Sequence, residues 1–459
     1  MVSGARPVIG HIREFARDGE RLLWRGFREH GLIFQMKMPG SNPSVVLLGQ
    51  EHSKRFFTDE SMSTAAAYPF LGRMFAPDFY SLGGKETYRQ QKDIMLPRFQ
   101  GAALDDYVEV MNSQADRFLE KLGDAGEFEL TDTFGPLVME IAARAFLGER
   151  FAEEMPGKDF FDEYRTFSEG LNFMPGWLPT PTGFRADRAR DRLKAAMGAM
   201  IAQRRRGTAE EFPDFLFTLA ESTYEDGTPV EVDVLVNIVL LLVWAGHETT
   251  TGALSWVLAD LLQHPEDLRR ARAEAEAVLA EGPLDLAASR KLKFLEACLY
   301  ASEQAHPISP VLLRNLLQEV RIGGYTLPAG TVVFAAPMVT HQLKDGQPWA
   351  NDFRPDLFLG PDAKTYKAAM IGFGGGVHRC LGVNFARMEM RILLARLLVG
   401  LDFELTTGAP RPPRRTETRW PESPCAVRYR ARPPAAADSG AVPAPNTDVA
   451  DPGPRCPLS

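Results

Sequence analysis

The chain has 459 residues, of which 45% are hydrophobic and 24% charged, and its formal net charge is −8 without a long block of either sign. This composition is ordinary for a soluble globular protein with a sizeable core, and the lack of clustered cations argues against nucleic acid as a partner. Four widely spaced cysteines without a CxxC pair argue against a disulfide framework or a structural zinc site, and no signal peptide or apolar run of roughly 18 residues is present. We therefore expect a cytoplasmic protein without a membrane anchor.

Most of the chain has the apolar spacing of helices. Short strands are expected near both ends, at residues 32–38, 44–48, 320–322 and 331–335. Amphipathic helical patterns occupy residues 101–122, 137–147, 185–206 and 265–279. Residues 433–459 are rich in Pro, Ala and Asp and predict a disordered tail behind one domain at residues 1–432. The expected fold class is mainly α with a small β region.

A long helix is expected at residues 233–263, with Ala245, Gly246, Glu248 and Thr249 near its centre. A glycine inside a buried helix costs about 1 kcal/mol, but it permits a bulge that leaves a backbone carbonyl free. Oxygen activation needs such a gap, with a hydroxyl and a carboxylate that pass protons, so Thr249 and Glu248 are candidate catalytic groups. The alternative is that Thr249 caps a kink and Glu248 is a solvated charge.

A strong helix pattern at residues 383–398 follows the loop Phe373-Gly374-Gly375-Gly376-Val377-His378-Arg379-Cys380-Leu381-Gly382. The glycines let this loop turn sharply and approach a flat ligand. Cys380 stands at the helix start, where unpaired N–H groups and the helix dipole favour the thiolate that ligates iron. Gly382 allows a close backbone approach, and Phe373 is placed to shield the sulfur. The alternative is that Cys380 is a buried structural cysteine. That interpretation is usual for a lone cysteine after glycine but explains this ten-residue pattern less well.

This loop resembles the haem-binding signature of the cytochrome P450 superfamily, and the likeness extends from Pro7 to about Arg430. Within the superfamily the chain is most similar to bacterial sterol 14α-demethylases, on residues 67–70 and 425–430. The resemblance implies a single-domain cytochrome P450 fold, with haem b between the long central helix and the helix after the cysteine loop. Cys380 would then be the axial ligand of the metal. Where those demethylases usually have His, this chain has Glu248, as in the general monooxygenase pattern.

The resemblance also implies contacts to the haem and to the substrate. Arg89, Arg314 and His378 match positions that bind the haem propionates, and an ordinary surface charge is the alternative for each. The cofactor would also contact Ala245, Gly246, Phe373, Gly374 and Gly382. A second wall of the pocket is expected at residues 170–179. The expected substrate pocket is apolar, as a lipophilic ligand requires, although each member could equally be core: Tyr68, Phe70, Phe75, Phe79, Leu241, Trp244, Val311 and Leu312.

One feature of the superfamily is missing from the sequence. Its internal ion-pair triad consists of a Glu and an Arg from an ExxR turn and a second Arg from a later loop. The corresponding positions are Ala301, Gln304 and Leu357. Because removing all members of a buried charge network is often nearly neutral, a folded variant is expected to lose them together. The loss puts the rigidity of the cysteine loop in question.

These features predict a cytochrome P450 monooxygenase, an oxidoreductase that incorporates O2 into a lipophilic sterol-, terpenoid- or other natural-product-like substrate by hydroxylation or oxidative cleavage. No flavin or reductase motif is present, so electrons from NAD(P)H are expected to arrive through a reductase and a separate ferredoxin. Arg98, Arg379 and Arg387 would present a basic face to that ferredoxin. We expect a monomer. Two alternatives keep the haem: an isomerase or dehydratase that uses the iron as a Lewis acid, and a non-catalytic haem-binding partner protein.

Overall fold

The computed structural model describes residues 1–433 apart from 40–43, 65–66, 69–70, 77–78, 83, 155–159, 171–179, 345–346, 349–351 and 414–417. Residues 434–459 of the expected tail and most of the expected second pocket wall lie outside the described residues.

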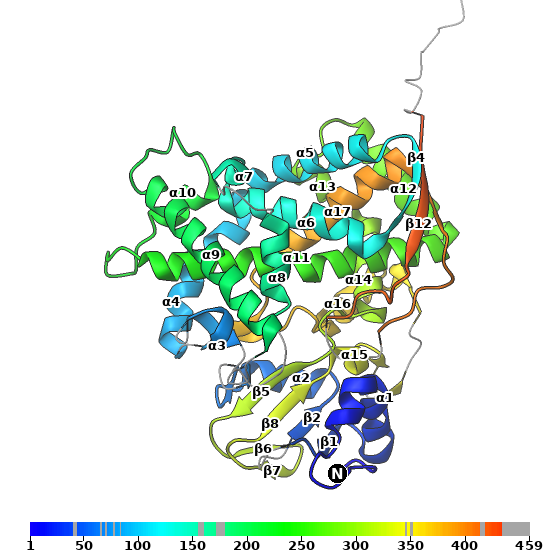
Figure 1. Ribbon diagram of the computed structural model, residues 1–459. Helices are drawn as coiled ribbons and strands as arrows, with labels where there is room; N and C mark the ends of the chain where they lie inside the picture. Colours follow the sequence, from blue (N-terminus) through cyan, green and yellow to red (C-terminus); the bar gives the residue numbers. More distant parts are fainter. Residues whose placement is uncertain are drawn as a thin grey trace, which may run out of the picture.

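A body of helices surrounds one long helix, α11 (Val232–Gln263), which runs through the middle of the molecule (Figure 1). The helices that pack most closely against it are α6 (Leu130–Leu147), α9 (Pro181–Arg204), α14 (Lys293–Ala305) and α17 (Val383–Gly400). The other helices are α1 (Ile12–His30), α2 (Gln50–Thr58), α3 (Leu71–Met74), α4 (Lys85–Met95), α5 (Asp105–Leu122), α7 (Phe151–Glu154), α8 (Phe160–Ser168), α10 (Phe215–Ala220), α12 (Pro265–Ala280), α13 (Leu286–Ser289), α15 (Pro337–Thr340) and α16 (Ala363–Ala369). Short 3-10 turns are η2 (Tyr80–Leu82), η3 (Leu96–Phe99), η4 (Gly101–Leu104), η5 (Pro355–Phe358) and η6 (Gly376–His378).

The largest sheet lies at one end of the helical body, beside α1 (Figure 1). Its strand order is β1-β2-β8-β5-β3, and only β2 and β8 pair in parallel, with Val45 opposite Val333. The bounds are β1 (Ile33–Met36), β2 (Ser44–Leu47), β3 (Met62–Ser63), β5 (Leu312–Leu316) and β8 (Val332–Ala335). The smaller sheets contain β4 (Ala125–Glu129), β11 (Leu401–Leu405) and β12 (Ala426–Ala431), then β6 (Val320–Ile322) with β7 (Tyr325–Leu327), and β9 (Leu343–Lys344) with β10 (Gln347–Pro348).

Local sequence explains how several helices begin. The Glu129 carboxylate accepts hydrogen bonds from the backbone N–H groups of Thr131 (2.7 Å) and Asp132 (3.1 Å), which caps α6. Thr180 caps α9 in the same way through the Gly183 N–H, and proline occupies the first helical position. By length and composition α11 would be able to cross a membrane, but here it is packed by helices on several sides.

The predicted elements agree well with the structure. The mainly α fold with a small β region is confirmed, and the predicted helix at residues 233–263 is α11 within one residue at its start. The predicted helix at 137–147 begins earlier, at Leu130, because Pro136 lies inside the helix without ending it. The sequence patterns missed β4, β11 and β12, whose partners lie far apart along the chain.

Candidate functional site

A cavity separates the cysteine loop from the middle of α11. Its volume is about 320 Å³, and a second cavity of about 320 Å³ adjoins it. Both are lined by Ala245 and Thr249 on α11 and by Phe373, Gly374, His378 and Cys380 on the loop. The structure therefore brings together the two segments that the sequence singled out.

Close backbone packing sets the position of the cysteine loop. Gly374 and Gly376 have φ values of +69° and +60°, a region that favours glycine. A Cβ atom on Gly376 would lie 2.3 Å from the Phe57 carbonyl oxygen, so only glycine lets the loop rest on α2. The Cys380 N–H donates to the Phe373 carbonyl at 2.8 Å and closes the loop just before α17.

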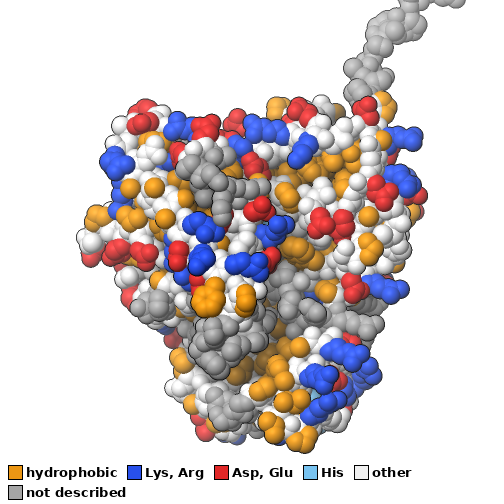
Figure 2. All heavy atoms as spheres, viewed as in Figure 1, with side chains coloured by type: hydrophobic (Ala, Val, Ile, Leu, Met, Phe, Trp, Pro, Cys, Tyr) orange, Lys and Arg blue, Asp and Glu red, His pale blue; other side chains and the backbone are white. Residues whose placement is uncertain are grey.

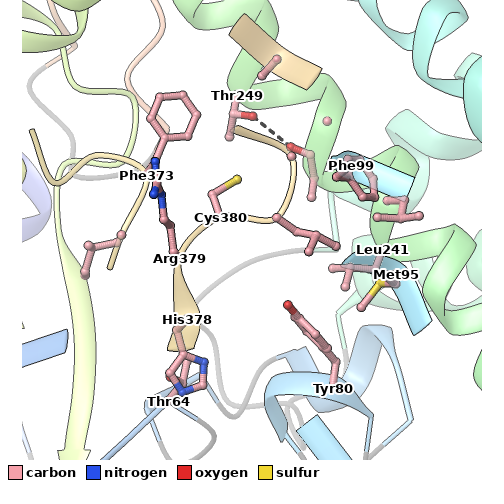
Figure 3. Close-up of a pocket in the computed structure, with 18 of the residues that line it drawn as sticks. Thr64, Tyr80, Met95, Phe99, Leu241, Thr249, Phe373, His378, Arg379 and Cys380 are labelled. Atoms are coloured by element: carbon pink, nitrogen blue, oxygen red, sulfur yellow. Dashed lines mark hydrogen bonds between the residues drawn. The ribbon is translucent and has the colours of Figure 1, made fainter. Parts of the chain in front are cut away.

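The Cys380 sulfur points into the cavity (Figure 3). Burial raises the pKa of its thiol, while the Gly382 backbone N–H and the positive charges of Arg379 and Arg387 lower the pKa. The N–H donor is the one expected at a helix start, so the local backbone favours the thiolate form. A thiolate in this position is a suitable ligand for a soft or borderline metal such as iron.

Thr249 faces the same cavity from α11. Its hydroxyl donates to the Ala245 carbonyl at 2.9 Å (Figure 3), and Gly246 also lines the cavity. The expected bulge with a free carbonyl is not seen, because α11 is continuous and the threonine hydroxyl occupies that carbonyl. Thr249 is therefore available at the cavity, but its hydroxyl already has an acceptor.

Glu248 is not among the residues that line this cavity. Its carboxylate bonds to Ser168 at the end of α8, and its carbonyl accepts from the Trp420 indole N–H at 2.9 Å. Burial raises the pKa of Glu248, and the Ser168 hydrogen bond opposes that shift. Successive residues of a helix point about 100° apart, so Glu248 and Thr249 do not face the same space.

A buried cation stands at the edge of the cavity. Arg314 on β5 is 6% exposed and lies over the Phe56 ring at 5.3 Å, and no carboxylate pairs with it among the described residues. Burial lowers the pKa of Arg314. His378 lies nearby, and burial together with Arg314 and Lys92 lowers its pKa to about 4. An unpaired buried arginine beside a cavity is costly unless an anionic ligand neutralises it.

Lys92, which the sequence reading missed, is the cation of α4 on this side. Its ammonium donates to the Val377 carbonyl at 2.5 Å, next to His378. Arg89, the expected contact, instead lies on the outer side of α4 and pairs with Glu86 (2.8 Å) and Glu225 (2.9 Å). The helical period would have indicated Lys92, because Tyr88, whose ring packs on His378, precedes it by four residues.

The expected substrate-pocket residues divide into two groups. Tyr68, Leu241 and Leu312 line the cavity. Phe75 and Phe79 are buried in the main core, where Trp244 packs against Phe75, and Val311 packs in the core beside the largest sheet. Phe70 lies outside the described residues. The cavity is also lined by aromatic and apolar side chains that the sequence did not single out: Phe57, Tyr80, Tyr88, Met95, Phe99 and Phe146.

The three triad positions are occupied by neutral side chains inside the protein. Ala301 is fully buried, Gln304 donates to the His341 carbonyl at 3.4 Å, and Leu357 packs on the main core. Among the arginines expected to form a basic face, only Arg379 is exposed. The Arg387 side chain is 15% exposed and pairs with Glu303.

Comparisons with known proteins agree with this geometry. The family model for cytochrome P450 matches residues 3–427. Lanosterol 14-alpha demethylase of Rattus norvegicus is 27% identical over 93% of this chain and 86% of its own length. Sterol 14alpha-demethylase of Mycobacterium bovis is 26% identical over 94% of this chain and 98% of its own.

Among solved structures, retinoic acid bound cyanobacterial CYP120A1 has a TM-score of 0.83 and 26% sequence identity, over 93% of this chain and 98% of that one. The chain belongs to the cytochrome P450 family.

Proposed function

We propose that this protein is a haem-thiolate monooxygenase in which Cys380 is the axial ligand of a haem b. The observation that carries the proposal is the Cys380 sulfur facing a cavity that has a threonine-bearing helix on one side and a buried, unpaired arginine at its edge. A thiolate-bound haem supplies the activation of dioxygen. Membership of the cytochrome P450 family supports the same chemistry.

The residues present fit a haem. We assign the two propionates to Arg314 and His378, which line the cavity, and to Lys92, whose ammonium lies at the Val377 carbonyl next to His378. Gly374 and Gly382 line the cavity without side chains, which lets a flat ring lie against the loop. Phe373 lies on the cysteine side and helps to exclude water from the sulfur.

Two groups on α11 are proposed to handle protons. The Thr249 hydroxyl lies at the cavity and holds a proton near the reacting oxygen. Glu248 is a half-buried carboxyl on an adjacent face of the helix, where its raised pKa suits a proton reserve. Its distance from the cavity requires that water or a side-chain movement complete the relay.

The cavity lining supports a lipophilic substrate of sterol, terpenoid or other natural-product type, since most of its side chains are apolar or aromatic. Relatives named for lanosterol and sterol demethylation, and a structural relative with bound retinoic acid, support this class. We further propose a cytoplasmic monomer that receives electrons from NAD(P)H through a reductase and a ferredoxin.

A haem-dependent isomerase or dehydratase is the second candidate. Two observations favour it: the Thr249 hydroxyl is bonded to the Ala245 carbonyl, and Glu248 does not reach the cavity. A haem-binding partner without turnover would share the same cavity and the same spectrum.

Turnover separates these candidates. Purified, haem-loaded protein is supplied with NADPH, a surrogate ferredoxin and its reductase, and a panel of sterols, terpenoids and retinoids under labelled O2. We expect at least one product that carries the oxygen label. A product that forms without NADPH and carries no oxygen label would show that the protein is an isomerase or dehydratase rather than a monooxygenase. Substrate binding without any product would favour the non-catalytic role.

A further inference from the structure

The ion-pair triad of the family is missing, but a charged pair lies next to its positions on α14. α14 carries neutral side chains at its two triad positions, Ala301 and Gln304, but Glu303 lies between them and is largely buried. Its carboxylate pairs with Arg387 on α17 at 3.1 Å, and the two side chains are only 14% and 15% exposed. A largely buried ion pair therefore joins α14 to the helix that begins just after Cys380.

Arg387 lies against the cysteine loop as well. Its guanidinium lies 3.9 Å from the centre of the Tyr300 ring and 5.0 Å from the centre of the Phe373 ring. It also donates to the Tyr300 hydroxyl. Stacking on an aromatic face is a contact for which a planar guanidinium is suited. The same side chain thus holds Glu303 and covers the phenylalanine whose carbonyl receives the Cys380 N–H.

The Glu303 carboxylate also touches the loop backbone. A Cβ atom on Gly372 would lie 2.7 Å from Glu303 Oε1, so the carboxylate rests directly on the residue before Phe373. The close approach requires glycine at this position, because a side chain would have to displace the carboxylate. The paired side chains therefore both contact the loop, Glu303 at Gly372 and Arg387 at Phe373.

A second link runs through the Glu303 backbone. The His341 Nε2 accepts from the Ile371 N–H at 2.9 Å, and its Nδ1 lies 3.2 Å from the Glu303 carbonyl. Because Nε2 accepts, the ring proton of the neutral imidazole is on Nδ1 and is donated to Glu303. Residue 303 thus connects to residues 371 and 372 by both its backbone and its side chain.

We propose that the Glu303–Arg387 pair, with Tyr300 and His341, replaces the missing triad and positions the cysteine loop for the haem. Glu303 and Arg387 are positioning residues, which act on the thiolate through Phe373 and the loop backbone. The inference rests on the proposed role of Cys380 as haem ligand. It accounts for a largely buried ion pair at the cysteine loop to which the proposed oxygen and proton chemistry assigns no role.

The test compares Glu303→Gln with Glu296→Gln in the haem-loaded protein. Glu296 pairs with Arg391 at 3.6 Å and joins the same two helices, but neither residue lines the two cavities. The reduced, carbon monoxide-bound protein is warmed mildly, and the loss of the thiolate band at about 450 nm is followed in time. The thermal midpoint of each haem-free variant records its general effect on stability.

We expect the band to disappear about tenfold faster in Glu303→Gln than in the unaltered protein, and within about twofold of the unaltered rate in Glu296→Gln. The haem-free midpoints of the two variants should be lowered by similar amounts. Equal rates of band loss in the two variants would overturn the proposal, because they would show only a shared structural effect.

A second variant covers the case in which Glu303→Gln does not fold. Arg387→Lys keeps the charge but loses the planar group that lies on Tyr300 and Phe373, so we expect an intermediate rate of band loss. An unchanged rate in Arg387→Lys would contradict the positioning role. If the unaltered protein has no band at about 450 nm, the haem-thiolate proposal itself fails. If the band is present but its rate of loss is unchanged in these variants, only the positioning role of Glu303 and Arg387 fails.

Discussion

At the residue scale, the clearest sign of an absent partner is Arg314. This guanidinium is 6% exposed, and its neighbours in the described part of the chain are the Phe56 ring, Tyr68 and Tyr88 rather than a carboxylate. Proteins seldom bury a cation without an anion, because desolvation costs several kcal/mol. A haem propionate would neutralise Arg314 at no cost to the rest of the fold.

Replacing Arg314 by Leu should therefore have opposite effects on two measurements. Haem binding should weaken by about 1.5–3 kcal/mol, the usual contribution of a hydrogen bond to a charged group. The haem-free protein should become more stable to urea, because an unpaired buried charge is removed. Haem titration and urea unfolding measure the two effects.

Arg89→Leu is the matched control for this experiment. Arg89 lies on the outer side of α4 among Glu86, Asp93 and Glu225. Its replacement should leave haem affinity unchanged. A loss of affinity equal to that of Arg314→Leu would mean that the propionates lie elsewhere.

At the scale of the element, α11 carries two threonines with the same hydrogen bond, one at the cavity and one away from it. Thr249 and Thr251 both donate to the carbonyl four residues earlier, at 2.9 and 2.8 Å, but only Thr249 lines the cavity. The two residues therefore form a matched pair that separates a role at the cavity from a role in helix geometry.

Thr249→Val should lower product formed per NADPH by roughly tenfold or more, since positioned proton transfer contributes factors of this size or larger. Oxygen consumption should continue and yield peroxide instead. Thr251→Val should keep the product yield close to that of the unaltered protein. Equal losses of yield in both variants would assign the effect to the helix rather than to the hydroxyl at the cavity.

The sequence predicted these elements more reliably than their contacts. Apolar periodicity gave α11 and α17 nearly to the residue, and the glycine pattern predicted a loop that faces α11. The family resemblance placed Arg89 at the cavity. In the structure Arg89 lies on the outer face of α4, and the helical spacing from Tyr88 brings Lys92 to the side of the cysteine loop instead. Glu303 was not assigned a partner because Arg387 is 84 residues away, and only packing brings them together.

At the scale of the whole molecule, charges of both signs are mixed over the face seen in Figure 2, in keeping with a net charge of −8. Such a surface favours solubility over tight binding to a polyanion. Apolar side chains gather on the same face near α1 and the largest sheet (Figure 2). The cavity is lined by residues of α11, β5 and the cysteine loop, so the proposed substrate would be recognised there rather than on this surface.

Buried histidines make the stability of the molecule depend on pH. Burial lowers the pKa of His341 and of His247 from 6.5 to about 4. The unfolded chain therefore binds more protons than the folded chain between these values, and stability is lost as the pH falls from 6.5 towards 4. We expect the free energy of unfolding to decrease by several kcal/mol over this range, at about 1.4 kcal/mol per pKa unit and per histidine.

Urea unfolding of the haem-loaded protein at several pH values measures this slope. His341→Gln, which cannot be protonated, should reduce the slope, and His30→Gln, at the exposed end of α1, should leave it unchanged. A slope that is the same in all three proteins would show that the His341 imidazole is not a source of the pH dependence.

The central claim is the bond between the Cys380 sulfur and haem iron, and the most direct measurement is the reduced, carbon monoxide-bound difference spectrum of the unaltered protein and of Cys380→Ala. We predict a band at about 450 nm in the unaltered protein and its loss in Cys380→Ala, with haem still bound through Arg314, His378 and Lys92. A band that survives in Cys380→Ala, or a haem-loaded protein that never shows it, would contradict the account.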